Sequence, residues 1–83
     1  MTGRRRFQLL HRHAATDCAT AFAAWKGYDS PLRHESVPAS CLYGGHTLWW
    51  TVEADDAEAA LGLLPPWVAA RTEVTPVRLT DLP

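Results

Sequence analysis

Residues 44–60 read GGHTLWWTVEADDAEAA and indicate the fold of this chain more clearly than any other stretch. Two glycines precede a run of aromatic and β-branched residues, which is typical of a tight turn followed by a strand, here expected over residues 46–52. Asp55 and Glu58 then have the spacing of a capping box, so we expect a helix to begin after Asp55. The apolar stripe of this helix would comprise Ala57, Ala60, Leu61 and Leu64.

Three other segments are expected to be strands. In residues 7–13, two sets of side chains alternate along the chain. This predicts a strand, because successive side chains of a strand point to opposite faces. Residues 36–43 and 72–79 carry strand-forming side chains, but each contains a proline, which predicts positions at the edges of a sheet. The Gly44-Gly45 pair would join residues 36–43 to the strand after it as a hairpin.

A first helix is expected between the first two strands. Thr16 or Asp17 can cap it, because a short side-chain oxygen accepts a free amide of the first turn. Its apolar stripe comprises Cys18, Ala21, Phe22 and Trp25. Gly27 is suited to the left-handed stop, and Pro65-Pro66 would end the second helix.

The resulting order β-α-β-β-α-β is that of the ferredoxin-like split unit, an α+β fold with one antiparallel sheet. Both helices would cover one face, and the first and third strands would be central. The 83 residues are expected to form a single domain, 1–83, in which residues 1–6 are a flexible tail. The open sheet face would carry Trp and Leu side chains, which predicts a homodimer or a larger homo-oligomer.

Composition excludes several classes of function. The chain is 47% hydrophobic and 20% charged, with a net charge of −1, so it has globular composition without the basic excess that nucleic-acid or membrane-surface binding requires. No segment approaches the roughly 20 apolar residues of a membrane-spanning helix. Two cysteines do not make a secreted disulfide framework, so we expect reduced thiols and a cytoplasmic protein.

A set of imidazoles and thiols is the clearest chemical feature. The expected topology brings all of them near one end of the sheet: His11, His13, Cys18, Cys41 and His46. In a two-residue hairpin, Cys41 and His46 would be diagonal neighbours roughly 7–8 Å apart, a separation that a metal ion can bridge. Such ligands favour zinc, nickel or copper over magnesium or calcium. Cys18 could instead be a core thiol, or a nucleophile at the start of its helix.

A second candidate site is a ligand cleft lined by Tyr43 and Trp50. Trp49 and Trp50 point to opposite faces of their strand, so one packs under the helices and the other can line a cleft. Asp17, His11 and His13 are candidate acid or base groups there.

Two passages carry a resemblance to a known superfamily. They are residues 48–60, LWWTVEADDAEAA, and the closing LPPW at 64–67 with EVTPV at 73–77. The chain from Phe7 to Leu79 resembles the small dimeric α+β-barrel proteins. Its end is similar to muconolactone isomerase-like proteins, and its layout to small nickel-binding ferredoxin-like proteins. The resemblance implies a ferredoxin-like homodimer and no particular catalytic residue.

Three functions are compatible with these residues. The first is a small cytoplasmic dimer that binds zinc, nickel or copper through the His/Cys set. The second is a cofactor-free enzyme of isomerase or cyclase type that acts on a small organic substrate. The third is an interaction module without catalysis, which would use its proline-bearing edge strands to pair with another chain.

Overall fold

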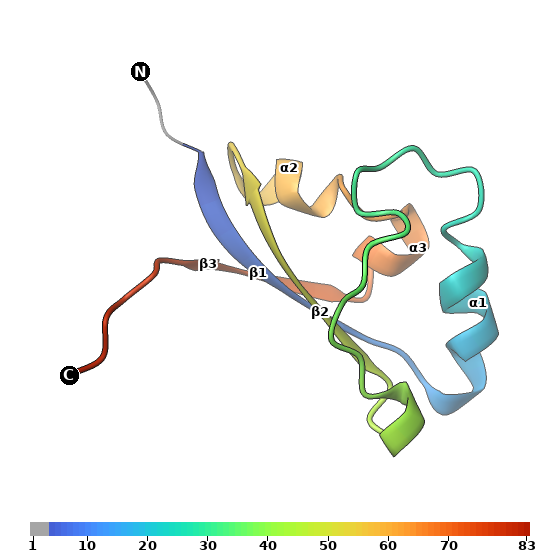
Figure 1. Cartoon of the computed structure of the whole chain (residues 1–83). Helices are drawn as coiled ribbons and strands as arrows, with labels where there is room; N and C mark the ends of the chain where they lie inside the picture. Colours follow the sequence, from blue (N-terminus) through green and yellow to red (C-terminus); the bar gives the residue numbers. More distant parts are fainter. Residues whose placement is uncertain (1–3) are drawn as a thin grey trace.

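Three strands form one antiparallel sheet in the order β2-β1-β3 in the computed structural model, which describes residues 4–83 (Figure 1). They are β1 (Arg5–Arg12), β2 (Thr47–Ala54) and β3 (Thr72–Val77). Leu9 of β1 lies opposite Trp50 of β2 and Val74 of β3, which places these three on one face. The strands expected at 7–13, 46–52 and 72–79 are therefore present, with shifted ends.

Short helices cover one face of this sheet (Figure 1). They are α1 (Cys18–Ala23), α2 (Ala57–Leu61) and α3 (Pro66–Ala69), with two 3-10 turns, η1 (Ala15–Asp17) and η2 (Cys41–Tyr43). Between the sheet and the helices lies a core of Phe7, Leu9, Leu48, Trp50, Val52, Ala54, Ala60, Leu64 and Val68. Every second residue of β1 and β2 thus contributes to the core, as the period of a strand requires.

The helix ends differ in detail from expectation. Asp56, rather than Asp55, caps α2, because its Oδ1 accepts the Ala59 amide at 2.7 Å. Asp17 precedes α1 without a side-chain capping bond and belongs to η1. Pro66 begins α3, since a proline at the first helical position lacks only an amide that has no helical partner.

The strand expected over residues 36–43 is not formed. Ala39 makes a single bridge to Leu48, and the chain then turns into η2. Two backbone-to-backbone hydrogen bonds join this segment to β2: Trp49 donates to the Pro38 carbonyl at 3.1 Å, and Ser40 donates to the Thr47 carbonyl at 2.9 Å. Pro38 has no amide to extend the ladder. The described sheet therefore keeps the expected first, third and fourth strands and reduces the second to a bridge.

The expected tail of residues 1–6 is only partly within the described residues, since residues 1–3 lie outside them. Arg5 and Arg6 begin β1, so they belong to the sheet. Arg6 pairs with Glu53 of β2 at 3.1 Å. At the other end of the chain, β3 stops at Val77, two residues before the expected end.

The face of the sheet away from the helices is mixed in character. Leu10 lies opposite Trp49, both half-buried, while Gln8 accepts a hydrogen bond from Thr51 at 2.7 Å. A barrel-like homodimer through this face stays a prediction, as does the cytoplasmic location. Within residues 4–83, none of the helices has the length and apolar character needed to cross a bilayer.

Candidate metal centre

Four side chains gather at one end of the sheet, where β1 ends and β2 begins. His13 follows β1, Cys18 is the first residue of α1, Cys41 is the first residue of η2, and His46 precedes β2. Taking one ligand atom from each residue, all four atoms lie within 4.8 Å of one another. These four residues are called the His/Cys cluster below.

The cluster has short internal contacts. Cys18 Sγ lies 3.2 Å from His46 Nδ1, and Cys41 Sγ lies 3.9 Å from His13 Nε2. The two imidazole rings have centroids 5.7 Å apart. A tetrahedral ion with bonds of about 2.0–2.3 Å would place its ligand atoms about 3.3–3.8 Å apart. Small side-chain adjustments would therefore bring all four atoms into coordination distance.

A tightly hydrogen-bonded loop, Ser40–Thr47, positions two of the four residues. Ser40 and Thr47 hold its ends together: the Ser40 amide donates to the Thr47 carbonyl at 2.9 Å, and the Thr47 amide donates to Ser40 Oγ at 3.2 Å. Inside the loop, the Gly45 amide donates to the Ser40 carbonyl at 2.9 Å. The predicted two-residue hairpin is thus replaced by a longer turn, which still directs Cys41 and His46 to one place.

His46 has an unusual backbone conformation, with φ of +48°. A non-glycine residue in this left-handed region is strained, and such strain is concentrated at functional sites in proteins. The His46 carbonyl accepts the His13 amide at 3.2 Å, which ties the loop to the end of β1. The strained residue is therefore a member of the His/Cys cluster, and a hydrogen bond links its backbone to a second member.

His11 lies behind the cluster and orients one of its members. It is buried, and its Nε2 lies 3.0 Å from His13 Nδ1. The other nitrogen, Nδ1, lies 3.2 Å from the Val68 carbonyl, which can only accept a hydrogen bond. His11 therefore donates from Nδ1 and accepts at Nε2 from His13 Nδ1–H. This leaves the lone pair of His13 on Nε2, the atom that faces Cys41.

Burial affects the protonation of two groups here. It lowers the pKa of His11, which keeps that ring neutral and preserves the hydrogen-bonding order above. Burial also raises the pKa of the Cys41 thiol, and the neighbouring Cys18 adds to the rise. Without an ion, Cys41 is therefore a thiol at neutral pH, and coordination would displace its proton.

The structure thus brings together four of the five predicted metal-site residues, and places His11 in contact with His13 rather than in the cluster. The ligand cleft of Tyr43 and Trp50 stays a prediction: Tyr43 is 88% exposed on η2, whereas Trp50 is 5% exposed in the core. Asp17 lies in η1 and makes no capping bond. A regular spacing could have indicated the cluster, since four residues separate His13 from Cys18 and four separate Cys41 from His46.

No protein family, curated protein or solved structure matches the chain. The resemblance to the dimeric α+β-barrel proteins therefore has no support from relatives. The structure itself supports the coarser description of a small α+β protein with a three-stranded antiparallel sheet, in which His13, Cys18, Cys41 and His46 lie close enough to bind a metal ion.

Proposed function

We propose that this protein is a small metal-binding protein that holds one transition-metal ion, zinc by preference, through His13, Cys18, Cys41 and His46. The observation that carries the proposal is the convergence of four ligand atoms within 4.8 Å from the end of β1, the start of α1 and the loop before β2. Thiolate and imidazole ligands select zinc, copper or nickel, and a tetrahedral set of two sulfurs and two nitrogens favours zinc.

The four-residue ligand set favours a site that holds an ion over a catalytic site that activates a water molecule. Four protein ligands fill a tetrahedral zinc ion, whereas catalytic zinc sites keep one position open. Cys18, Cys41 and His46 are only half-buried, so an ion can enter and leave from solvent without unfolding of the core. Such access favours a role in which the ion exchanges, as in storage, delivery or sensing.

Metal titration of untagged protein tests the proposal. The chain is purified under reducing conditions without a polyhistidine tag, stripped with a chelator, and titrated with Co²⁺ and then Zn²⁺. We expect one ion per chain, the visible bands of tetrahedral Co²⁺, and a thiolate-to-cobalt charge-transfer band that Zn²⁺ removes. Absence of these bands, together with no retained zinc, nickel or copper by elemental analysis, would refute the proposal.

Two histidines provide a matched pair of variants. His46 and His34 are the non-glycine residues with positive φ among residues 4–83, at +48° and +71°, and only His46 belongs to the cluster. Asparagine tolerates this backbone region, so both His→Asn changes preserve the turn. We expect His46→Asn, like Cys41→Ser, to lower Co²⁺ affinity at least about tenfold, and His34→Asn to leave it unchanged. Equal affinities for the two Asn variants would contradict the assignment.

A further inference from the structure

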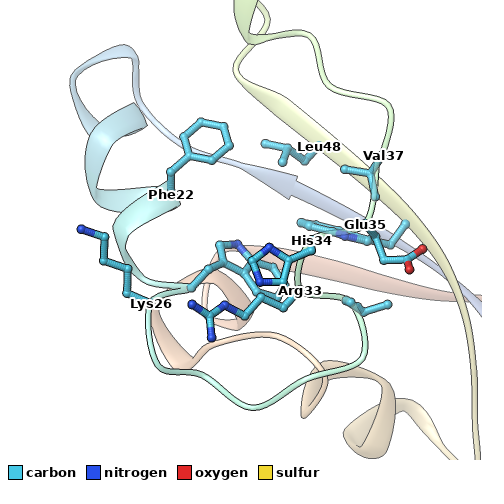
Figure 2. A pocket seen from close by; sticks show the side chains of 10 residues that line it. Phe22, Lys26, Arg33, His34, Glu35, Val37 and Leu48 are labelled. Atoms are coloured by element: carbon cyan, nitrogen blue, oxygen red, sulfur yellow. The ribbon is translucent and has the colours of Figure 1, made fainter.

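We infer that a hollow between α1 and residues 32–37 binds a small planar ligand that carries a carboxylate. The hollow has a volume of about 310 Å³, which suits a small organic molecule. Figure 2 shows Phe22 and Leu48 reaching into it from α1 and β2, with Arg33 and His34 opposite them. It lies apart from the His/Cys cluster, since none of the four cluster residues lines it.

The floor of this pocket is aromatic. Trp50 is buried, Trp25 is partly buried, and their ring centroids lie 6.0 Å apart at a tilt of 41°. Phe22 stands at the pocket with 55% of its surface exposed. A flat ring placed on this floor would gain the offset or edge contacts that aromatic groups prefer and would cover Phe22. The floor therefore favours a planar apolar group.

The rim supplies the charge. Lys26 and Arg33 line the pocket, and within residues 4–83 neither takes part in an ion pair. Glu35 is the acidic residue of the lining, and Figure 2 shows its carboxylate on the other side of the pocket from Lys26 and Arg33. The two cations therefore leave a net positive rim, and the Arg33 guanidinium can bind a carboxylate through two parallel hydrogen bonds.

The wall that presents Arg33 is held in place before any ligand arrives. The Arg33 amide donates to the Ser30 carbonyl at 3.1 Å, and Ser30 Oγ donates to the Leu63 carbonyl at 2.6 Å. Tyr28 adds a second tie through its hydroxyl, which donates to the Gly62 carbonyl at 2.6 Å. Because this turn is anchored to the segment after α2, binding need not order it, which favours affinity.

Tryptophan fluorescence with 1-naphthoate as the probe tests the inference. The titration is done on chelator-treated protein and repeated with zinc, so that its outcome does not depend on metal binding. We expect saturable quenching of Trp25 and Trp50 by 1-naphthoate, and binding of the neutral 1-naphthalenemethanol that is at least about fivefold weaker. Equal affinity for the two probes would show an apolar patch without anion recognition and overturn the inference, as would absence of saturable quenching.

Substitutions on the rim locate the charge. We expect Arg33→Gln and Lys26→Gln each to weaken 1-naphthoate binding severalfold while leaving 1-naphthalenemethanol unaffected. Arg12→Gln is the matched control, because Arg12 is exposed at the end of β1 and does not line the pocket. All three residues are exposed, so the circular dichroism of the variants should match that of the unmodified chain. A loss of 1-naphthoate binding in Arg12→Gln equal to that in Arg33→Gln would overturn the assignment to this pocket.

Discussion

At the scale of single residues, His11 makes the stability of the metal-free protein depend on pH. Burial lowers its pKa in the folded state below the ordinary value of 6.5, so the unfolded chain takes up the proton first. Above pH 6.5 the ring is neutral in both states and its contribution to stability is complete. As the pH falls below 6.5 toward the folded pKa, that contribution is progressively lost.

We therefore predict that the free energy of unfolding decreases as the pH is lowered from about 7 to 5, measured by urea denaturation in the presence of a chelator. His11→Asn removes the titrating group and should flatten this part of the profile, even though the variant is less stable at every pH. A profile with the same slope in both proteins would assign the pH dependence to other groups.

At the scale of elements, the Ser40–Thr47 loop depends on the missing side chain of Gly45. A Cβ at this position would lie 2.2 Å from Ser40 Oγ and 2.8 Å from Ser40 Cβ. We predict that Gly45→Ala forces the loop to open, lowers the free energy of unfolding by about 1–3 kcal/mol, and weakens Co²⁺ binding roughly tenfold or more. Urea denaturation and cobalt titration of the same variant measure the two effects.

Gly62 provides the control for this loop. It has an ordinary helical φ of −64°, and an added Cβ would meet only carbonyl oxygens at 3.4–3.5 Å. Gly62→Ala should therefore leave cobalt affinity unchanged and stability within about 1 kcal/mol of the unmodified chain. If Gly45→Ala behaved in the same way, the loop would not be needed to position Cys41 and His46.

At the scale of the whole molecule, the core and the metal centre would stabilise different parts of the chain. Apart from the Ala39 bridge, residues 24–40 contain no helix or strand, and Cys18 and Cys41 lie on either side of them. A bound ion would join the two ends of this long connection and stabilise the folded state, as any ligand specific for that state does. At a free ion concentration of 100 times Kd, this linkage amounts to about 2.7 kcal/mol.

We predict that chelation of the ion lowers the melting temperature by roughly 10 °C or more at such a concentration. Hydrogen exchange should speed up locally at the amides of His13, Ser40 and Gly45, whose partners lie in or beside the cluster. The amides that pair β1 with β3 should keep their protection. Uniform loss of protection, or none, would show that the ion does not act through this end of the molecule.

Much of the fold could be predicted from the sequence, because strand periodicity and turn residues are local signals. The segments 7–13 and 46–52 were recognisable from their own side chains. The conformation of the segment 36–43 could not be predicted from its own side chains. It depends on the small number of hydrogen bonds that this segment makes with β2, because Pro38 has no amide to donate. Whether such a segment becomes a strand depends on its pairing with the neighbouring strand, and the local sequence pattern does not describe that pairing.

The site was predictable in part for a topological reason. Antiparallel strands that end and begin at one edge bring their flanking residues together, so His13 and His46 could be expected to meet. The role of His11 could not, because it rests on the Val68 carbonyl, fifty-seven residues away in the chain. Likewise, the 3-10 turn that carries Cys41 follows from hydrogen bonds to Ser40 rather than from the glycine pair alone.

The position of the cluster along the chain has a consequence for biosynthesis. All four ligands have left the ribosome once His46 emerges, and β2, the first of the two strands that pair with β1, is complete eight residues later, at Ala54. Neither α3 nor β3 contributes a ligand. Once the residues up to Ala54 have left the ribosomal exit tunnel, they include all four ligands and the β1–β2 pair, so the ion can bind while α3 and β3 are still inside the tunnel. The Val68 carbonyl, which orients His11, leaves the ribosome only afterwards. Ion capture would therefore precede the final orientation of His11 against His13.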